Sequence, residues 1–398
     1  MATPKFEICK RGDCVKSSPM KYRPLDEKSV LSFAQPFLLH EPLTAQEVGD
    51  GNLNLVFRVL SENSSIIIKQ ALPYLRVAGS TWPLTRNRAR IEAEAIIYQE
   101  SLFPGILPKL IFFDKSMSAL VLEDLLPMRS WRDCLIEQGE TLEVVRDVAK
   151  YVGTILIASS KWNIGNDEKQ DLRGRFIFSG LCLLSEDLIF TAPFKVSESN
   201  KFSEELEPLV NHLQGDQEIQ RIVGQMKSIF KTRHDALIHG DLHTGSVMTD
   251  GKNHRIIDLE FAFFGPFGFD PGLICAHLIL ARISHFVRGN LNYCHVIDRS
   301  IQEFWAILET TMLQNWKRSP EEFSDFLRQL HLDAVKFAGI EMVRRIIGLA
   351  HVKEIEDLPS ELKFSAEEIA LRIGSKLIKS NSTESFAQTL TAVLEEER

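Results

Sequence analysis

The chain has 398 residues, 44% of them hydrophobic, which is enough to bury two cores, so we expect two lobes or domains. A net charge of −8 argues against a nucleic-acid-binding protein, because such a protein normally presents a basic face to phosphates. No apolar run approaches the roughly 18 residues of a membrane-spanning helix, and residues 1–13 lack the apolar centre of a signal peptide. The six cysteines are scattered without C-x-x-C or zinc-ligand spacing, as expected of reduced thiols in a cytoplasmic protein with no membrane partner.

The first third of the chain predicts a small antiparallel sheet with one helix. Residues 55–59 and 66–69 are short β-branched runs on either side of a polar break, which is typical of a strand hairpin. Residues 112–113 and 120–122 predict two more strands. Between the hairpin and these two strands, the apolar spacing over residues 86–102 predicts a helix.

Beyond residue 123 the sequence predicts a mainly helical region. Long amphipathic stretches predict helices over residues 141–159, 202–233, 270–287, 301–316 and 320–351. The polar tail, residues 379–398, indicates a terminal helix that frays. We find no repeat and no Pro/Gly/Ser linker, so we expect the two halves to pack directly across a cleft.

These elements predict an α+β fold with two lobes. The N-terminal lobe, residues 1–122, would carry the antiparallel sheet, and the C-terminal lobe, residues 127–398, would be helical. Residues 123–126 would form the hinge between them.

A glycine turn precedes the first strand of the hairpin, in the sequence Gly49-Asp50-Gly51-Asn52-Leu53-Asn54. Small or turn-tolerant residues let backbone N–H groups approach the phosphates of a nucleotide, and Asn54 tolerates a positive φ better than most residues. An ordinary hairpin turn explains the same pattern equally well. The turn is neither a Walker A loop, since no Gly-Lys-Ser/Thr follows, nor a dinucleotide fingerprint, since no helix follows.

Lys69 ends the buried run of isoleucines one strand after that turn. A buried lysine is costly unless an anion meets it, and nucleotide phosphates are such an anion. A snorkelling surface lysine is the alternative. In the nucleotide interpretation Lys69 needs a glutamate from the following helix; Glu92 is the first choice and Glu94 the second, because they lie about 200° apart on a helix.

The most specific motif is His239-Gly240-Asp241-Leu242-His243, followed 17 positions after Asp241 by Asp258 at the end of a short apolar run. In kinases of small molecules, a His-Gly-Asp-x-His loop supplies the aspartate that accepts the proton of the substrate hydroxyl. A second aspartate after a short strand binds magnesium. The pairing predicts Asp241 as the catalytic base and Asp258 as a metal ligand.

The metal ligands depart from the usual pattern at two positions. Ser246 stands where the loop normally has an asparagine that binds the second magnesium, and Glu260 stands two residues after Asp258, where protein kinases have a glycine. Magnesium prefers hard oxygen ligands. We therefore predict Asp258 and Glu260 as the metal pair, with Ser246 as a weaker candidate ligand.

Several stretches together resemble the 5-methylthioribose kinase family, a branch of the protein-kinase-like superfamily. They span most of the chain and comprise residues 49–54, 69–74, 80–85, 239–246, 261–266 and 268–270.

The resemblance implies an ATP- and Mg²⁺-dependent kinase that phosphorylates the C1 hydroxyl of methylthioribose in methionine salvage. It implies a tryptophan loop with Trp82 over the active site, and an arginine pair, Arg344 and Arg345, that reaches the sugar. It also implies adenine binding by the hinge main chain at Glu123 and Leu125, and a homodimer. Because adjacent residues point about 100° apart on a helix, one arginine could instead be solvated.

Three positions depart from the pattern of this family: Leu259, Phe267 and Pro271 stand where proline, methionine and isoleucine are expected. None of them removes a charged group, so phosphoryl transfer should survive, but the acceptor pocket could be shifted. The alternatives are a kinase of an aminoglycoside, choline or homoserine, and a pseudokinase that binds ligands without chemistry.

Overall fold

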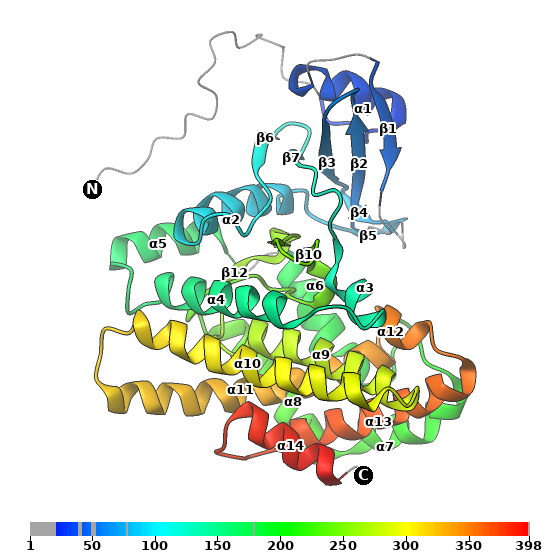
Figure 1. Ribbon diagram of the computed structural model, residues 1–398, viewed down its shortest axis with the longest axis vertical. Coiled ribbons are helices and arrows are strands. Elements are labelled where there is room, and N and C mark those ends of the chain that lie inside the picture. Colours follow the sequence, from blue (N-terminus) through cyan, green and yellow to red (C-terminus); the bar gives the residue numbers. More distant parts are fainter. Residues whose placement is uncertain (1–20, 39–41, 49–52, 77–78, 178–179, 397–398) are drawn as a thin grey trace. The chain divides into compact units, whose positions relative to one another are not determined.

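The computed structural model describes residues 21–38, 42–48, 53–76, 79–177 and 180–396. The chain folds into two compact units (Figure 1). The N-terminal unit comprises residues 1–97 and 108–125, and the C-terminal unit comprises residues 98–107 and 126–398.

The N-terminal unit is built on a five-stranded antiparallel sheet, as the sequence predicts. The strand order is β1-β2-β3-β7-β6. The strands are β1 (Thr44–Glu47), β2 (Asn54–Leu60), β3 (Ser65–Ala71), β6 (Leu110–Asp114) and β7 (Ala119–Glu123). The predicted α+β class, with an antiparallel N-terminal lobe and a helical C-terminal lobe, is confirmed.

Alternation along β3 explains how the sheet buries one face. Ile66 and Ile68 are buried, and Phe57 and Val59 of β2 join them in one apolar cluster. Helix α1 (Glu27–Ala34), which the sequence analysis did not predict, covers this cluster with Val30 and Phe33. Register then pairs Lys69, the next residue on the central strand β3, with Leu120 of the neighbouring strand β7.

Helix α2 (Arg88–Leu102) begins two residues after its predicted start at residue 86. It follows a small hairpin of β4 (Tyr74–Leu75) and β5 (Gly79–Pro83), which carries the half-buried Trp82. Arg88 is fully buried and connects these segments. Its guanidinium donates to the carbonyls of Leu53, Leu72 and Thr85 and to Oδ1 of Asn54, at distances of 2.6 to 3.2 Å.

The C-terminal unit is mainly helical, with five short strands. Its helices are α3 (Trp131–Ile136), α4 (Leu142–Ala158), α5 (Asn166–Arg175), α6 (Gly180–Phe190), α7 (Glu207–Gly215), α8 (Gln217–Thr232), α9 (Phe269–Val287), α10 (Leu291–Gln314), α11 (Pro320–Ile347), α12 (Lys353–Glu356), α13 (Ser360–Lys379) and α14 (Phe386–Glu396). Its strands are β8 (Arg129–Ser130), β9 (Ala236–Ile238), β10 (Val247–Thr249), β11 (His254–Ile256) and β12 (Phe263–Gly265), arranged as β11-β10-β8 and β12-β9.

Three helix predictions need correction. The single helix predicted over residues 202–233 is two helices, because the Asp216 carboxylate caps the N-terminus of α8. Helix α10 begins at Leu291, ten residues before its predicted start. The tail is not a frayed helix: α13 ends at Lys379, and α14 packs on α10, α11 and α13 through the fully buried Phe386.

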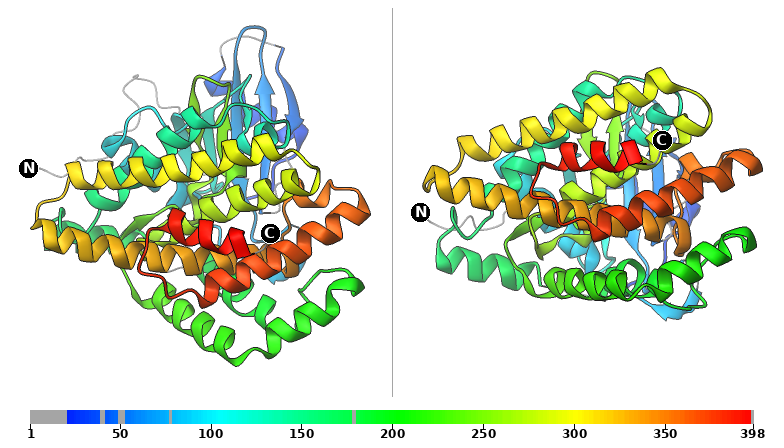
Figure 2. Two further views of the ribbon diagram at one scale, coloured as in Figure 1. Left: turned by 60° about the horizontal axis from the view of Figure 1, so that its bottom comes forward. Right: turned by 90° about the horizontal axis from the view of Figure 1, so that it is seen from below.

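Helix α11 is central to the packing of the C-terminal unit. It contacts α9 on one side and α13 on the other, while α10 packs against α4 and α9 (Figure 2). The approach to α13 is close, since a Cβ added to Gly339 would lie 2.5 Å from the carbonyl oxygen of Gly374. The approach of α9 to α11 is also close, since a Cβ added to Gly272 of α9 would lie 2.7 Å from the carbonyl oxygen of Ala334 on α11.

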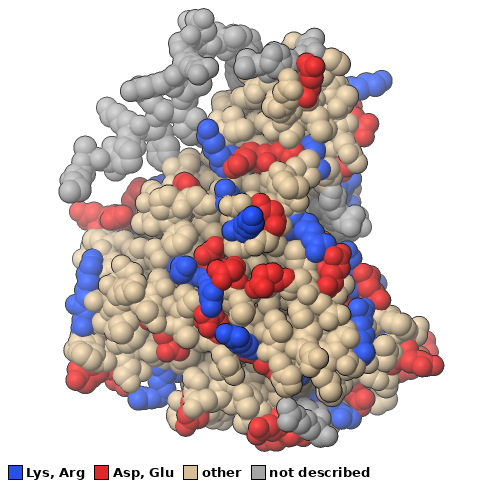
Figure 3. All heavy atoms as spheres, viewed as in Figure 1, with Lys and Arg blue, Asp and Glu red and all other residues tan. Residues whose placement is uncertain are grey.

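Within the described residues no single helix is long and apolar enough to cross a membrane. One bent pair, Asn166–Arg175 with Gly180–Phe194, reaches the required length and composition. On the face of the C-terminal unit in Figure 3, acidic and basic side chains are interspersed.

The buried guanidinium of Arg88 should be essential to the stability of the N-terminal unit. An Arg88→Met variant leaves four acceptors, two buried and two partly buried, without their donor, and we expect the opening free energy of β2 and β3 to fall by about 3 kcal/mol. Amide hydrogen exchange of these strands measures it. Arg90→Met, which removes a half-buried arginine two residues further along α2 that pairs with Glu94, should change this free energy by only about 0.5 kcal/mol. Equal effects of the two substitutions would contradict this role for Arg88.

Candidate active site

The His-Gly-Asp motif forms a loop between β9 and β10 in the C-terminal unit. Asp270, in the first turn of α9, holds the start of this loop: its carboxylate accepts hydrogen bonds from the backbone N–H groups of His239 (2.6 Å) and Gly240 (3.0 Å). Gly240 has a φ of 84°, and a Cβ at this position would lie 2.3 Å from the carbonyl oxygen of Phe261. Only glycine fits there, which explains the middle residue of the motif.

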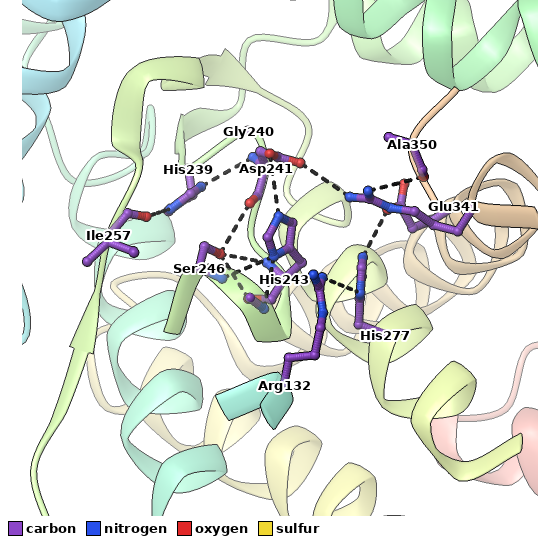
Figure 4. Close-up of polar contacts among 12 residues, drawn as sticks. Arg132, His239, Gly240, Asp241, His243, Ser246, Ile257, His277, Glu341 and Ala350 are labelled. Carbon is purple, nitrogen blue, oxygen red and sulfur yellow. Dashed lines mark hydrogen bonds and ion pairs between the residues drawn. The ribbon is translucent and has the colours of Figure 1, made fainter. Parts of the chain in front are cut away.

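His239 connects the loop to the strand that leads to the metal motif. Its Nε2–H donates to the carbonyl of Ile257 (2.9 Å), and its Nδ1 accepts from the backbone N–H of Asp241 (3.2 Å). The side chain is 1% exposed. One imidazole therefore fixes the backbone at Asp241 relative to the residue before Asp258 (Figure 4).

Asp241 is the accessible carboxylate of the loop, with 26% of its side chain exposed. Oδ1 lies 3.6 Å from Nη2 of Arg344 and 3.8 Å from Nη2 of Arg345. Oδ2 lies 3.7 Å from Nε2 of His243, whose Nδ1 accepts hydrogen bonds from the backbone N–H groups of residues 245 and 246. The carboxylate is thus held between two guanidiniums and an imidazole with one side toward solvent.

Neither arginine is solvated: each is 7% exposed. Both bind Glu341, which lies three and four residues earlier on α11 and is fully buried. Nε of Arg344 donates to Oε2 (2.6 Å) and Nε of Arg345 donates to Oε1 (2.7 Å). The alternative that one of the pair points to water is therefore excluded.

His277 of α9 is the third donor to Glu341. Its Nε2–H donates to Oε1 of Glu341 (3.1 Å), and its Nδ1 accepts from Nη2 of Arg132 (3.4 Å), so the neighbours define the tautomer (Figure 4). Arg132 in turn lies 3.3 Å from the buried carboxylate of Glu354. Three arginines and three carboxylates, those of Asp241, Glu341 and Glu354, thus form one mostly buried array.

Burial and charge shift the ionisation of this array. Burial lowers the pKa of His277 to about 3, although its bond to Glu341 opposes the shift. Burial also lowers the pKa of His243 well below its usual value, and the positive charge of Arg132 adds to this shift. Burial alone would raise the pKa of Glu341, but Arg344 and Arg345 hold it well below the usual range. Both imidazoles are therefore neutral at pH 7, and Glu341 is ionised.

Asp258 and Glu260 lie at a sharp turn after β11. Asp258 has a left-handed backbone (φ 68°), and Glu260 is buried in the 3₁₀ turn Leu259–Phe261 that follows. Among the described residues, no three His, Cys, Asp or Glu side chains form a metal cluster. Two carboxylates fit Mg²⁺, because this ion takes few protein ligands and completes its shell with water and phosphate oxygens.

Ser246 is 1% exposed and uses its hydroxyl within the loop. Its Oγ accepts from the backbone N–H of His243 (2.9 Å) and lies within bonding distance of the carbonyls of His243 and Asp241. The side chain thus closes a capping box in the catalytic loop, which gives it a structural role independent of any metal.

In the N-terminal unit, Lys69 pairs with the first-choice glutamate. Nζ of Lys69 donates to Oε1 of Glu92 (2.8 Å), and both side chains are buried. Glu94 instead pairs with Arg90 at 2.8 Å. Lys69 is therefore not a snorkelling surface lysine.

The glycine turn is only partly described. Gly49, Asp50, Gly51 and Asn52 lie outside the described residues. Asn54 is the first residue of β2, and its φ is not positive. Its side-chain Oδ1 accepts a hydrogen bond from Nε of Arg88. The expectation that asparagine stands here because it tolerates a positive φ is therefore wrong. The structure shows instead a hydrogen bond from Arg88 to its side chain.

The remaining predicted residues belong to the N-terminal unit. Trp82 is on β5, Glu123 ends β7, and Leu125 is the last residue of the N-terminal unit.

Sequence reasoning missed four residues of the array: Arg132, His277, Glu341 and Glu354. For Glu341 a signal existed, because positions 341, 344 and 345 follow the spacing that places side chains on one helical face. His277 lies seven residues after Asp270, two turns along the same face of α9. Arg132 and Glu354 carry no local signal, since they reach the array through tertiary packing.

Comparisons with known proteins place the chain among phosphotransferases. Residues 193–293, which contain the His-Gly-Asp loop and Asp258, match the phosphotransferase enzyme family, APH. The methylthioribose kinase of Geobacillus sp. (strain WCH70) is 38% identical over 94% of this chain and 98% of its own. The methylthioribose kinase of Bacillus cereus (strain AH187) is 34% identical over 95% of this chain and 98% of its own.

A solved structure of a more distant kinase is also similar. The choline kinase from Cryptosporidium parvum Iowa II is 14% identical, with a TM-score of 0.48 over 94% of this chain and 95% of its own. These values are too low to carry a functional conclusion.

The depressed pKa of His277 predicts acid sensitivity. An unfolded histidine (pKa about 6.5) binds a proton between pH 6.5 and 3, whereas folded His277 stays neutral, so the unfolding free energy falls as pH drops through this window. From pH 7 to pH 5 the loss from this imidazole is about 2 kcal/mol. Between pH 7 and pH 5, the unfolding free energy of His277→Asn should therefore fall by about 2 kcal/mol less than that of the wild type. Urea unfolding, monitored by tryptophan fluorescence at each pH, measures it.

The matched control is His295→Asn, which changes an exposed histidine on α10. It should keep the pH dependence of the wild type. If His277→Asn also kept the full pH dependence, His277 would not be buried neutral in the native state.

Proposed function

Because this chain belongs to the methylthioribose kinase family, we propose that it transfers the γ-phosphoryl group of ATP to the C1 hydroxyl of 5-methylthioribose. The products would be ADP and 5-methylthioribose 1-phosphate, a step of methionine salvage. The observation that carries the chemistry is Asp241, a partly exposed carboxylate on a loop fixed from behind and flanked by two buried arginines.

Asp241 acts on the acceptor. Its carboxylate accepts a hydrogen bond from the C1 hydroxyl and orients that oxygen toward the γ-phosphorus. As the bond from this oxygen to phosphorus forms, the bond from phosphorus to the β,γ-bridging oxygen breaks. The hydroxyl proton passes to Asp241, and ADP leaves with the electron pair of the broken bond.

Arg344 and Arg345 stabilise negative charge near Asp241. Their Nη2 groups face Oδ1 of Asp241 at 3.6 and 3.8 Å, so an oxygen atom that approaches the carboxylate also meets two cationic donors. Such fixed donors stabilise charge without reorganisation during the reaction. They also hold the sugar hydroxyls, which gives the pair a role in acceptor binding.

In this proposal the nucleotide is bound by the residues that the sequence predicts for it. Lys69, oriented by Glu92, binds the α- and β-phosphates, and residues 49–54 cover the phosphates. The main chain at Glu123 and Leu125 binds the adenine, and Trp82 covers the acceptor. Asp258 and Glu260 would hold Mg²⁺, which when bound neutralises charge on the phosphate oxygens.

We place the reaction in the cytoplasm and expect a homodimer. The four described cysteines are buried free thiols, in keeping with a reducing compartment. The homodimer rests on the family resemblance, and light scattering after size exclusion measures it.

The proposed acceptor can be tested directly with purified protein, Mg²⁺ and ATP. We expect ADP release to depend on 5-methylthioribose, with phosphorus NMR locating the new phosphate at C1. Ribose, choline, homoserine and kanamycin serve as comparison acceptors. A kcat/KM for any of these that equals or exceeds that for methylthioribose would refute the proposed acceptor, and Mg-dependent turnover of none of them would refute the kinase itself.

Substitution of the two aspartates should separate chemistry from metal binding. Asp241→Asn should lower kcat by a factor of about 10² to 10⁴ with nearly unchanged MgATP affinity, because only the proton acceptor is lost. Asp258→Asn should also weaken MgATP binding, measured by calorimetry with and without Mg²⁺. Asp250→Asn, at the exposed β10–β11 turn, is the matched control and should behave as wild type. Wild-type turnover by Asp241→Asn would eliminate this residue as the base.

A further inference from the structure

Glu341 is a fully buried carboxylate that no part of the proposed reaction uses directly. Three donors meet on it: Nε of Arg344, Nε of Arg345 and Nε2 of His277, at 2.6, 2.7 and 3.1 Å. We propose that Glu341 is the positioning residue that fixes both guanidiniums toward Asp241. This inference rests on the proposed function, because it assigns the arginine pair to the acceptor.

Two adjacent arginines on a helix do not converge on their own. Their side chains leave the helix about 100° apart, and long cationic side chains normally extend to water. Like charges at this separation also repel. A carboxylate three and four residues earlier faces both side chains, so Glu341 occupies a position that can bring them together.

The way in which each guanidinium is bound matters for function. Both use Nε on Glu341, which leaves Nη2 as the group nearest to Asp241. The Nη2 groups lie 3.6 and 3.8 Å from Oδ1, longer than a hydrogen bond. Glu341 thus anchors the inner edge of each planar group and presents the outer edge where an acceptor oxygen would arrive.

His277 and Arg132 fix the carboxylate itself. The Nε2–H of His277 binds the same Oε1 that accepts from Arg345, and Nδ1 of His277 is occupied by Arg132. His277 belongs to α9, which also carries Asp270 and so holds the catalytic loop. The orientation of the arginines is therefore tied to the element that places Asp241.

Glu341→Asp tests positioning without changing charge. The shorter side chain withdraws the carboxylate, so it cannot accept from both Nε groups in their present places. We expect kcat/KM for methylthioribose to fall about 10²-fold, the effect of a misplacement of about 1 Å, while KM for MgATP stays within about twofold. Glu341→Gln should lower kcat/KM further, because the amide brings a donor against one of the donors that now bind there.

Glu367→Asp and Glu367→Gln are the matched controls. Glu367 is a glutamate of α13, 3% exposed, outside the array around Asp241. These substitutions should leave both kinetic terms unchanged. A thermal melt of each variant shows whether it is folded at the assay temperature, and Glu341→Asp keeps the proposal testable if Glu341→Gln does not fold.

Nitrogen-15 NMR of the arginine Nε–H groups gives a measurement that needs no acceptor. Signals of Arg344 and Arg345, assigned with Arg→Lys variants, should exchange slowly with water in the wild type and rapidly in Glu341→Asp. Unchanged exchange would overturn the proposal. So would a kcat/KM for methylthioribose within about twofold of wild type, or equal losses for the acceptor and MgATP.

The two proposals fail in different ways. If the wild type transferred no phosphate to methylthioribose, the proposed function would be wrong, and the exchange measurement alone would decide whether Glu341 positions the arginines. If the wild type is active, both kinetics and exchange must change in Glu341→Asp for the positioning role to hold.

Discussion

The C-terminal unit depends on the mutual neutralisation of charges that helix α11 carries into the protein interior. Arg344 and Arg345 are both buried, and two unpaired guanidiniums in such a place would cost several kcal/mol each. Glu341 compensates them from one side and Asp241 from the other. Since Glu341 is wholly enclosed whereas Asp241 is partly open, the compensation is asymmetric, and only the outer carboxylate is accessible to a reactant.

The sequence predicted those parts of the fold and site that local pattern determines. A run of three isoleucines predicts Lys69 at the end of a buried strand, and the 200° separation of Glu92 and Glu94 on a helix limits its partner to one of these two glutamates. The structure selects Glu92. The His-Gly-Asp motif was recognised from its letters alone. Its glycine is explained by the structure, because the approach of Phe261 to Gly240 leaves no space for a Cβ.

The rest could not be predicted, because it is created by contacts between residues distant in sequence. Arg132 reaches His277 across 145 positions, and no local pattern marks Arg132. The local pattern at Asn54 suggests a positive φ, whereas the observed role of its side chain is a hydrogen bond with the buried Arg88. Helix α14 was expected to fray because its tail is polar, but Phe386 anchors it in the core. In each case tertiary packing overrides the local preference.

Helix α9 has a mechanical consequence that follows from two of its residues. The Asp270 carboxylate binds the backbone of the His-Gly-Asp loop. Two turns further on, His277 donates to the Glu341 carboxylate, which binds both guanidiniums. Seven residues of helix, roughly 10 Å at 1.5 Å per residue, therefore set the spacing between the Asp241 loop and the two guanidiniums. Core substitutions that tilt α9 would change the distance between Asp241 and the two guanidiniums. They would do so from far away and without removing any of these groups.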